Sequence, residues 1–294
     1  MHIEKQVFDT DKENICVMFS GGYDSTLLLI KALELKKNRK ISQVYTIYID
    51  CPLFPNNEKQ TKHMHDILSK LRDKFGNFDN QIIGLNFSGT QVNCNRIAIP
   101  QLLTFLPTCL LRIPDNTEIW FGMIDDRTIS EKVLYSKEKA MKDIIDISVK
   151  HFIDCKNVSI RCPILGLGGT IRNKKAFIID QLLSNYKYIF DKCFSCDEIF
   201  SSDDEYDCMC SKHIELLDAL IDIYQYTYNR HYNINKRSLQ YNIFNENKGS
   251  IAECEKKMKL IHEVFKKYFP SYFNMLNHLT NDSNSKIIAS ETDE

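Results

Sequence analysis

The sequence predicts an α/β fold: a doubly wound, mostly parallel sheet, followed by a cysteine-rich segment and a helical C-terminal extension. Short β-branched or apolar runs alternate with helical patterns up to about Cys162. Beyond that point the alternation stops, and helical patterns predominate. With 294 residues, 43% of them hydrophobic, the chain is long enough for one large domain with an appendage, or for two small domains.

The predicted elements follow one another along the chain in strand and helix order. We expect strands at 15–19, 44–50, 81–87, 118–122 and 158–164, and helices between them at 25–37, 59–75, 97–111 and 130–152. Further helices are expected at 174–190, 214–228 and 254–269. The resulting division is an α/β domain at 1–190, a metal-binding segment at 191–215, a helical extension at 216–280 and a disordered tail at 281–294.

Charge and hydropathy exclude several classes of protein. The 38 basic and 39 acidic residues nearly cancel, so there is no global electrostatic footprint for a polyanion, although a local basic face remains possible. The N-terminal residues lack the apolar core of a signal peptide, and no apolar run approaches the roughly 18 residues of a membrane span. We therefore expect a cytoplasmic protein that does not enter a membrane.

The segment SGGYDS, residues 20–25, lies where the first predicted strand meets the first predicted helix. A glycine-rich turn there presents successive backbone N–H groups and the positive end of the helix dipole to an anion. Hydroxyl groups can add donors, and Asp24 can cap the helix or orient a cation. A tight turn with a side-chain cap is the alternative. The expected nucleotide-binding residues of this loop are Ser20, Gly21, Gly22, Asp24, Ser25 and Thr26.

This loop is neither a Walker A sequence, because the lysine is missing, nor the dinucleotide GxGxxG. It resembles the signature of the ATP pyrophosphatases, which cleave ATP between the α and β phosphates and adenylate a substrate oxygen. The resemblance implies an adenine nucleotide alpha hydrolase-like fold. It also implies ATP and Mg²⁺ as cofactors.

Three later positions extend the predicted nucleotide site. Asp50 would end the second strand, where related enzymes place the adenosine, although it can equally cap a helix. Asp125, Asp126 and Arg127 follow the strand that ends near Gly122. Carboxylates there suit Mg²⁺, and an arginine can stabilise charge on the leaving pyrophosphate, whereas a polar loop with a salt bridge is the alternative. We expect Asp24, Asp126 and Arg127 to be catalytic.

A lysine at the start of a helix is the last expected catalytic group. In the ATP pyrophosphatases a proline-containing segment leads to such a lysine, and residues 161–178 are similar to that region. Lys174 is our choice, with Lys175 and Arg172 as alternatives, because a lysine offers a point charge to phosphate.

Four cysteines lie close together in a polar segment: Cys193, Cys196, Cys208 and Cys210. Two close pairs separated by a loop can converge tetrahedrally on Zn²⁺, so we expect a structural zinc knuckle. The second pair has the tight C-x-C spacing, which keeps His213 as a substitute ligand. A redox pair is the alternative, although no thioredoxin-like βαβ pattern surrounds it.

Together, the SGGYDS loop and the cysteine cluster resemble the 7-cyano-7-deazaguanine synthase family over residues 14–215. The resemblance implies a homodimeric C–N ligase with one zinc per subunit. Such an enzyme adenylates 7-carboxy-7-deazaguanine with ATP and uses ammonia to reach the nitrile in queuosine biosynthesis. The chain departs from the family in its cysteine spacing, in the loop after Gly122, where the family has Tyr-Pro-Asp-Cys-Arg, and in its C-terminal extension.

These departures leave two alternatives to the deazaguanine synthase. One is a divergent relative that modifies nucleic acid or attaches a deazapurine to a protein, as relatives in antiviral defence suggest. The other is a non-catalytic nucleotide-binding scaffold, which the intact SGGYDS segment disfavours.

Overall fold

The computed structural model of the chain describes residues 7–50, 57–84, 105–124, 131–167, 171–193, 211–231 and 250–274. The predicted tail at 281–294 lies outside these ranges. The chain divides into two compact units, Met1–Ser195 and Cys196–Glu294, and each is described here by itself.

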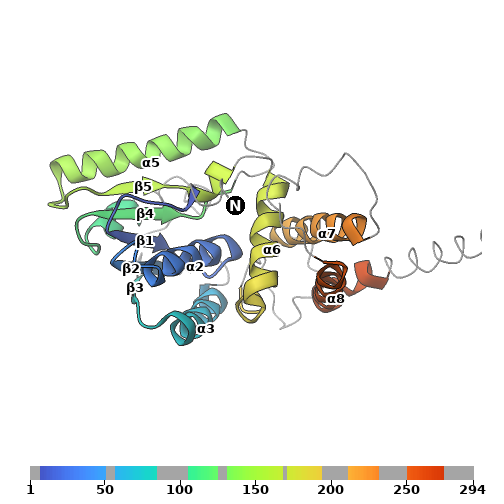
Figure 1. Cartoon of the computed structure of the whole chain (residues 1–294). Coiled ribbons are helices and arrows are strands. Elements are labelled where there is room, and N and C mark those ends of the chain that lie inside the picture. Colours follow the sequence, from blue (N-terminus) through green and yellow to red (C-terminus); the bar gives the residue numbers. More distant parts are fainter. Residues whose placement is uncertain are drawn as a thin grey trace, which may run out of the picture. The chain divides into compact units, whose positions relative to one another are not determined.

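The first unit contains a five-stranded parallel sheet (Figure 1). The strands lie in the order β3-β2-β1-β4-β5. Chain order is reversed on the two sides of β1, which makes the sheet doubly wound and confirms the predicted α/β fold. The strands are β1 (Asn14–Met18), β2 (Gln43–Asp50), β3 (Asp79–Gly84), β4 (Thr117–Phe121) and β5 (Ser159–Arg161).

Helices cover both faces of this sheet, which explains why every residue of the central strand β1 is buried. The helix at 105–110 and α5 (Glu131–His151) pack on the face that includes Cys16 and Ile119. The helix α2 (Tyr23–Lys37) contacts β1, β2 and β4, and it also contacts α3 (Asn57–Phe75) and α6 (Ile171–Phe190). The helix predicted at 97–111 is described only from residue 105 onward.

The last strand is shorter than the predicted 158–164 because the chain turns into the 3₁₀ helix η2 (Pro163–Leu167). Pro163 has no N–H to donate to a neighbouring strand, so the ladder ends before it. A second irregularity lies in α6, where Tyr186 has non-helical φ and ψ values of −144° and 39°.

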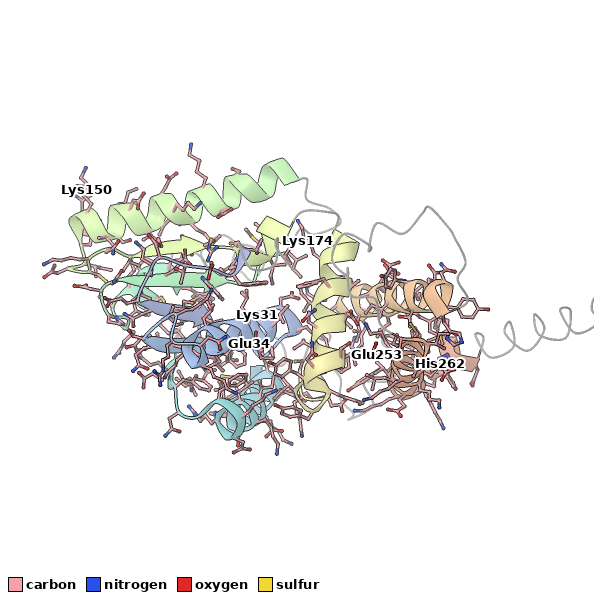
Figure 2. The ribbon with its side chains drawn as sticks, viewed as in Figure 1. Lys31, Glu34, Lys150, Lys174, Glu253 and His262 are labelled. Carbon is pink, nitrogen blue, oxygen red and sulfur yellow. The ribbon has the colours of Figure 1, made fainter. Side chains whose placement is uncertain are left out.

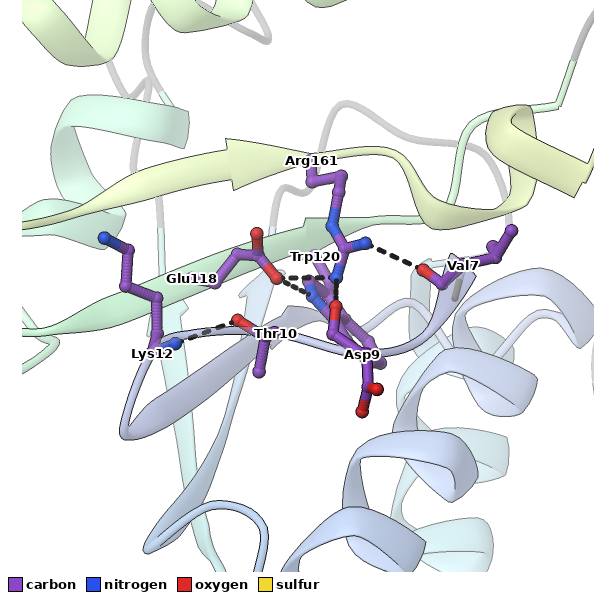
Figure 3. A network of polar contacts seen from close by, with 7 residues as sticks. All are labelled: Val7, Asp9, Thr10, Lys12, Glu118, Trp120 and Arg161. Atoms are coloured by element: carbon purple, nitrogen blue, oxygen red, sulfur yellow. Dashed lines mark hydrogen bonds and ion pairs between the residues drawn. The ribbon is translucent and has the colours of Figure 1, made fainter. Parts of the chain in front are cut away.

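A polar network joins the N-terminal segment to β4 and β5 (Figure 3). The Arg161 guanidinium donates to the Val7 carbonyl at 2.8 Å, the Asp9 carbonyl at 2.6 Å and the Glu118 carboxylate at 2.8 Å. The Trp120 indole N–H donates to the same carboxylate at 2.7 Å. The only tryptophan in the chain therefore has its polar group satisfied in the core.

The second unit contains α7 (Ser211–His231) and α8 (Ile251–Tyr268), which pack together. Helix α8 begins with a capping box, in which Ser250 and Glu253 bond each other's backbone N–H groups. Tyr224 of α7 lies against His262 of α8, with ring centroids 5.1 Å apart. Among the helices that the structure describes, none combines the length and apolar character needed to cross a membrane.

Candidate functional site

The candidate site lies at the carboxyl ends of β1 and β4, where the chain order of the sheet reverses. Parallel α/β sheets place ligands at this position because the loops on either side of the reversal diverge and leave a crevice. The loop that follows β1 leads into α2, and the segment that follows β4 passes close to it. A Cβ atom added to Gly122 would lie 3.2 Å from the Ser25 nitrogen.

The loop between β1 and α2 has the conformation that its glycines permit. Gly21 has a φ of +78°, a value that other residues rarely adopt, and a Cβ added there would lie 3.4 Å from the backbone of Met64. Gly22 is the N-cap residue of α2, and because it has no side chain the helix begins without a side-chain cap. The first intrahelical bond comes from the Thr26 N–H to the Gly22 carbonyl, so the first-turn N–H groups have no partner within the helix.

The two serines of the loop bond to it internally. The Ser20 N–H donates to Ser25 Oγ at 3.2 Å, and the two hydroxyl oxygens lie 3.1 Å apart. Ser25 Oγ also contacts the Gly22 carbonyl, and Ser20 Oγ accepts from the Gly22 N–H at 3.4 Å. The loop therefore carries hydroxyl groups and helix-terminal N–H groups together, which is the donor set that a phosphate requires.

Asp24, in the first turn of α2, forms an ion pair with Lys175 of α6. The Lys175 Nζ lies 3.0 Å from Asp24 Oδ1. The lysine side chain is 5% exposed and the aspartate side chain 24%, so the ammonium is held inside while the carboxylate reaches the surface of the site. The Lys175 ammonium also lies 5.7 Å from the centroid of the Tyr23 ring.

A pocket of about 230 Å³ opens beside this loop. Ser20, Gly22, Asp24 and Ser25 form its polar side. The carboxyl ends of the strands and the helix at 105–110 supply the apolar side, with Met18, Phe19, Ile47, Tyr48, Ile49, Phe105 and Phe121. An apolar wall beside a set of anion donors suits a ligand with a planar base and a phosphate chain.

Cys193 lies just beyond α6 and close to the same helix terminus. Burial raises the pKa of Cys193 to about 12, although the Thr26 hydroxyl and the Lys175 ammonium act in the opposite direction. Its thiol donates to the Ile189 carbonyl at 3.5 Å. The first cysteine of the predicted metal-binding segment is thus a neighbour of the Asp24–Lys175 pair.

The structure brings part of the predicted site together. Ser20, Gly22, Asp24 and Ser25 line the pocket, and Gly21 shapes the loop behind them. Thr26 is fully buried, and Asp50 is half-buried, but neither lines the pocket. Lys174 is buried in α6 (Figure 2), and it is the adjacent Lys175 that reaches Asp24.

Other predicted residues lie outside the candidate site or outside the described parts of the chain. Asp126, Arg127, Cys196, Cys208 and Cys210 lie outside the described ranges, and so does the glycine pair Gly168 and Gly169. His213, the substitute zinc ligand, is buried in α7 with its ring 6.3 Å from that of Phe269. Within the described parts of the chain, no three His, Cys, Asp or Glu side chains are grouped so that they could hold a metal ion.

Sequence reasoning missed Gln60 and Tyr48 as residues of the pocket. Gln60 of α3 donates to the Ser20 carbonyl at 2.9 Å, and the Tyr48 hydroxyl accepts from Thr61 at 3.2 Å. Tyr48 could have been found from its place near the end of a predicted strand. No local signal distinguishes Gln60 from the other polar residues of its helix.

Comparison with known proteins agrees with this geometry. Residues 1–89 match the family model ATP_bind_3, a PP-loop domain. Two tRNA(Ile)-lysidine synthases are similar to part of the chain. The one from Buchnera aphidicola subsp. Baizongia pistaciae is 41% identical over 59 residues, and the one from Buchnera aphidicola subsp. Schizaphis graminum is 33% identical over 70 residues. These alignments cover 20% and 24% of this chain but only 14% and 16% of the relatives.

Solved structures give weaker similarities over most of the chain. The U34-tRNA thiolase NcsA from Methanococcus maripaludis, with its [4Fe-4S] cluster, aligns with 88% of this chain and 77% of its own, at 13% identity and a TM-score of 0.38. An NH3-dependent NAD synthetase from Campylobacter jejuni subsp. jejuni, in complex with a nitrate ion, aligns with 90% of this chain and 91% of its own, at 13% identity and a TM-score of 0.32. Such scores define no substrate for the present chain.

Proposed function

We propose, on the premise that residues 1–89 match a PP-loop domain, that the chain is an ATP-dependent enzyme that releases AMP and pyrophosphate. The single observation that carries this proposal is the SGGYDS loop at the carboxyl end of β1. There, helix-terminal N–H groups, two serine hydroxyls and the Asp24–Lys175 pair lie beside a pocket with an apolar wall. This arrangement offers one place for a pyrophosphate group and another for a base.

The proposed reaction begins with attack of a substrate oxygen on the α phosphorus of ATP. The bond between the α phosphorus and the bridging oxygen breaks, and pyrophosphate leaves with the electron pair. An amine then attacks the adenylated carbon, loses a proton and displaces AMP. Loop N–H groups, the hydroxyls of Ser20 and Ser25, and the Lys175 ammonium would stabilise the departing pyrophosphate, so most of the catalysis is positioning.

The ion pair between Asp24 and Lys175 gives this scheme a specific electrostatic feature. An unpaired Asp24 carboxylate at the mouth of the pocket would repel a polyphosphate, and the Lys175 ammonium compensates that charge before ATP arrives. When bound, Mg²⁺ would supply further positive charge to the phosphates. Asp126 is the proposed ligand of this ion.

The proposed substrate is 7-carboxy-7-deazaguanine, with ammonia as the amine and the nitrile as the final product. Adenylation of the carboxylate followed by ammonia gives an amide. A second adenylation, of the amide oxygen, allows loss of AMP and a proton to form the nitrile. The resemblance of residues 14–215 to the deazaguanine synthases supports this choice. From the same resemblance we propose a homodimer that holds a structural zinc on Cys193, Cys196, Cys208 and Cys210.

A second candidate substrate is a nucleobase within RNA. The observation that favours it is the similarity of part of this chain to two tRNA(Ile)-lysidine synthases. The chemistry would be the same, with a base oxygen adenylated in place of a free carboxylate. A third candidate, attachment of a deazapurine to a protein, would use the same adenylation with a protein amine in place of ammonia.

The test is product analysis by mass spectrometry. The protein is incubated with ATP, Mg²⁺ and ammonium, and with either 7-carboxy-7-deazaguanine or unfractionated tRNA. We expect AMP and pyrophosphate, together with a modified small molecule or nucleoside. Release of ADP and phosphate instead would contradict the proposal, as would the absence of any nucleotide cleavage with every substrate.

Variants connect the activity to the site. Asp24→Asn and Ser20→Ala should abolish AMP formation and leave the fold intact, because both residues lie at the pocket. Lys175→Met should lower kcat/KM at least about tenfold, since a charge-assisted contact contributes roughly 1.5–3 kcal/mol. Lys187→Met is the matched control on the same helix, because Lys187 pairs with Asp191 and is partly exposed. An active Lys175→Met protein would remove Lys175 from the mechanism.

A further inference from the structure

One face of α3 rests on the SGGYDS loop. Gln60 and Met64 are four residues apart and therefore lie on the same side of this helix. The Gln60 amide Nε2 donates to the Ser20 carbonyl at 2.9 Å. The Met64 backbone packs close to Gly21: a Cβ added to this glycine would lie only 3.4 Å from it. The helix thus contacts two consecutive residues of the loop, one by a hydrogen bond and one by close packing.

The hydrogen bond from Gln60 acts on a rigid unit. In a trans peptide the carbonyl of residue 20 and the N–H of residue 21 lie in one plane and point in opposite directions. Holding the Ser20 carbonyl on α3 therefore also sets the direction of the Gly21 N–H. Gly21 imposes little restraint itself, because a glycine can adopt φ values of either sign.

The loop's other bonds do not replace this one. The Ser20 N–H, the Gly22 N–H and the Gly22 carbonyl are each bonded to a serine hydroxyl of the loop itself. A phosphate that recruits those hydroxyls would loosen these bonds. The bond from Gln60 comes from a different helix, so it can persist while the ligand binds.

We infer that Gln60 is a positioning residue for the pyrophosphate group. Its amide fixes the Ser20 carbonyl by a hydrogen bond from α3. The Gly21 N–H of the same peptide is then directed to the proposed anion site. This inference rests on the proposed function, because it assumes that the loop binds the phosphates of ATP. Gln60 itself lies at the pocket but needs no contact with the reacting atoms for this role.

Two substitutions at position 60 and one control test the inference. Gln60→Ala removes the donor. Gln60→Glu keeps the shape but, when ionised, has no proton to give the Ser20 carbonyl and adds negative charge beside the pocket. Gln81→Ala is the matched control, because the Gln81 amide also donates to a backbone carbonyl, that of Arg112, at 3.1 Å, and Gln81 does not line the pocket.

The first readout needs no ligand and no activity. Hydrogen–deuterium exchange of peptides that cover residues 19–25 should become faster in Gln60→Ala and stay unchanged in Gln81→Ala, with equal melting temperatures for both. Unchanged exchange in Gln60→Ala would overturn the inference whatever the protein binds.

The second readout is calorimetric binding of pyrophosphate and of AMP. Gln60→Ala should weaken pyrophosphate binding about three- to tenfold, the typical effect of one neutral hydrogen bond, and Gln60→Glu should weaken it more. AMP binding should change less than twofold, which a general loss of structure would not produce. Equal pyrophosphate affinity in wild type and Gln60→Ala would overturn this inference but leave the proposed function standing. A wild-type protein that binds neither pyrophosphate nor ATP would overturn the proposed function as well.

Discussion

At the residue scale, two glycines with nearly the same positive φ differ in their surroundings. Gly21 and Gly76 have φ values of +78° and +79°. A Cβ on Gly76 would meet nothing within 4 Å, whereas a Cβ on Gly21 would contact the backbone of Met64. Gly76 directly follows α3 and Gly21 lies in the SGGYDS loop, so a residue with a Cβ would meet a similar restriction on φ at both positions but different neighbours.

We predict that Gly76→Ala lowers the free energy of unfolding by about 1 kcal/mol, the cost of a left-handed conformation in a residue with a Cβ, without changing ATP turnover. Gly21→Ala should cost at least as much and also reduce kcat/KM for AMP formation about tenfold or more, because a residue with a Cβ disfavours the positive φ of Gly21, and a change in φ would redirect the N–H groups that we propose bind phosphate. Denaturant unfolding and a pyrophosphate-release assay measure the two effects. Full activity in Gly21→Ala would show that the loop tolerates displacement and does not need its present shape.

At the scale of elements, the predicted zinc-binding segment begins directly after α6. Cys193 is its first cysteine, and it lies beside Thr26 and Lys175. Because structural zinc contributes folding energy directly, loss of one ligand should destabilise the protein strongly.

We predict one zinc per chain, and a large fall in melting temperature for Cys196→Ser or Cys208→Ser. Cys254→Ser, at a buried cysteine of α8 outside the cluster, is the control and should keep its zinc. Elemental analysis of protein purified without chelators, combined with thermal unfolding, decides the matter. A zinc-free chain that is folded and active would contradict the zinc site and favour a redox or simple structural role for the four cysteines.

A histidine lies where α7 packs against α8. Burial lowers the pKa of His262 below its ordinary value of 6.5. The ring packs against Tyr224 and lies 5.9 Å from the ring of Phe273; Figure 2 labels it on α8. Above pH 6.5 the histidine is neutral in both the folded and unfolded states. As the pH falls below that value, the unfolded chain binds the proton first, so stability is lost on acidification.

We predict that the free energy of unfolding of the helical unit decreases between pH 7.5 and 5.5, and that His262→Phe makes this decrease smaller. His151→Gln, at an exposed histidine of α5, should leave the pH dependence unchanged. The measurement is urea unfolding at both pH values, monitored by hydrogen–deuterium exchange of the α7 and α8 amides. An identical pH dependence in His262→Phe would assign the effect to other groups.

At the scale of the whole molecule, one arginine holds together segments that are far apart in the sequence. Arg161 contacts residues 7, 9 and 118, and it lies over the Trp120 ring at 5.6 Å (Figure 3). The Glu118 side chain is 11% exposed, so its carboxylate depends on the arginine and the indole for hydrogen bonds.

We predict that Arg161→Ala destabilises the protein by about 2 kcal/mol, since it leaves a largely buried carboxylate with one fewer charged partner. Combining it with Glu118→Gln should recover part of the loss, because the uncompensated charge is removed. Arg112→Ala, at an exposed arginine, serves as the control. Equal unfolding free energies for wild type and Arg161→Ala would show that the network contributes nothing net.

The amino-acid sequence by itself determined the α/β class, the position of the SGGYDS loop between a strand and a helix, and the helical nature of α7 and α8. These features depend on local patterns: the alternation of strand and helix periods, and the ordered residues 20–25 at a strand–helix junction. The sequence therefore predicts Ser20, Gly22, Asp24 and Ser25 as site residues, and in the fold these four line one pocket.

Only the tertiary structure decided which distant residues join that loop. Lys174 and Lys175 are indistinguishable by type, but the rotation of α6 directs Lys175 to Asp24, 151 positions earlier in the chain. Gln60 reaches Ser20 because α3 packs against the loop, and nothing in its neighbouring residues indicates this. Such contacts depend on how helices pack across a twisted sheet, and a periodic pattern along one segment carries no information about the partner that it meets.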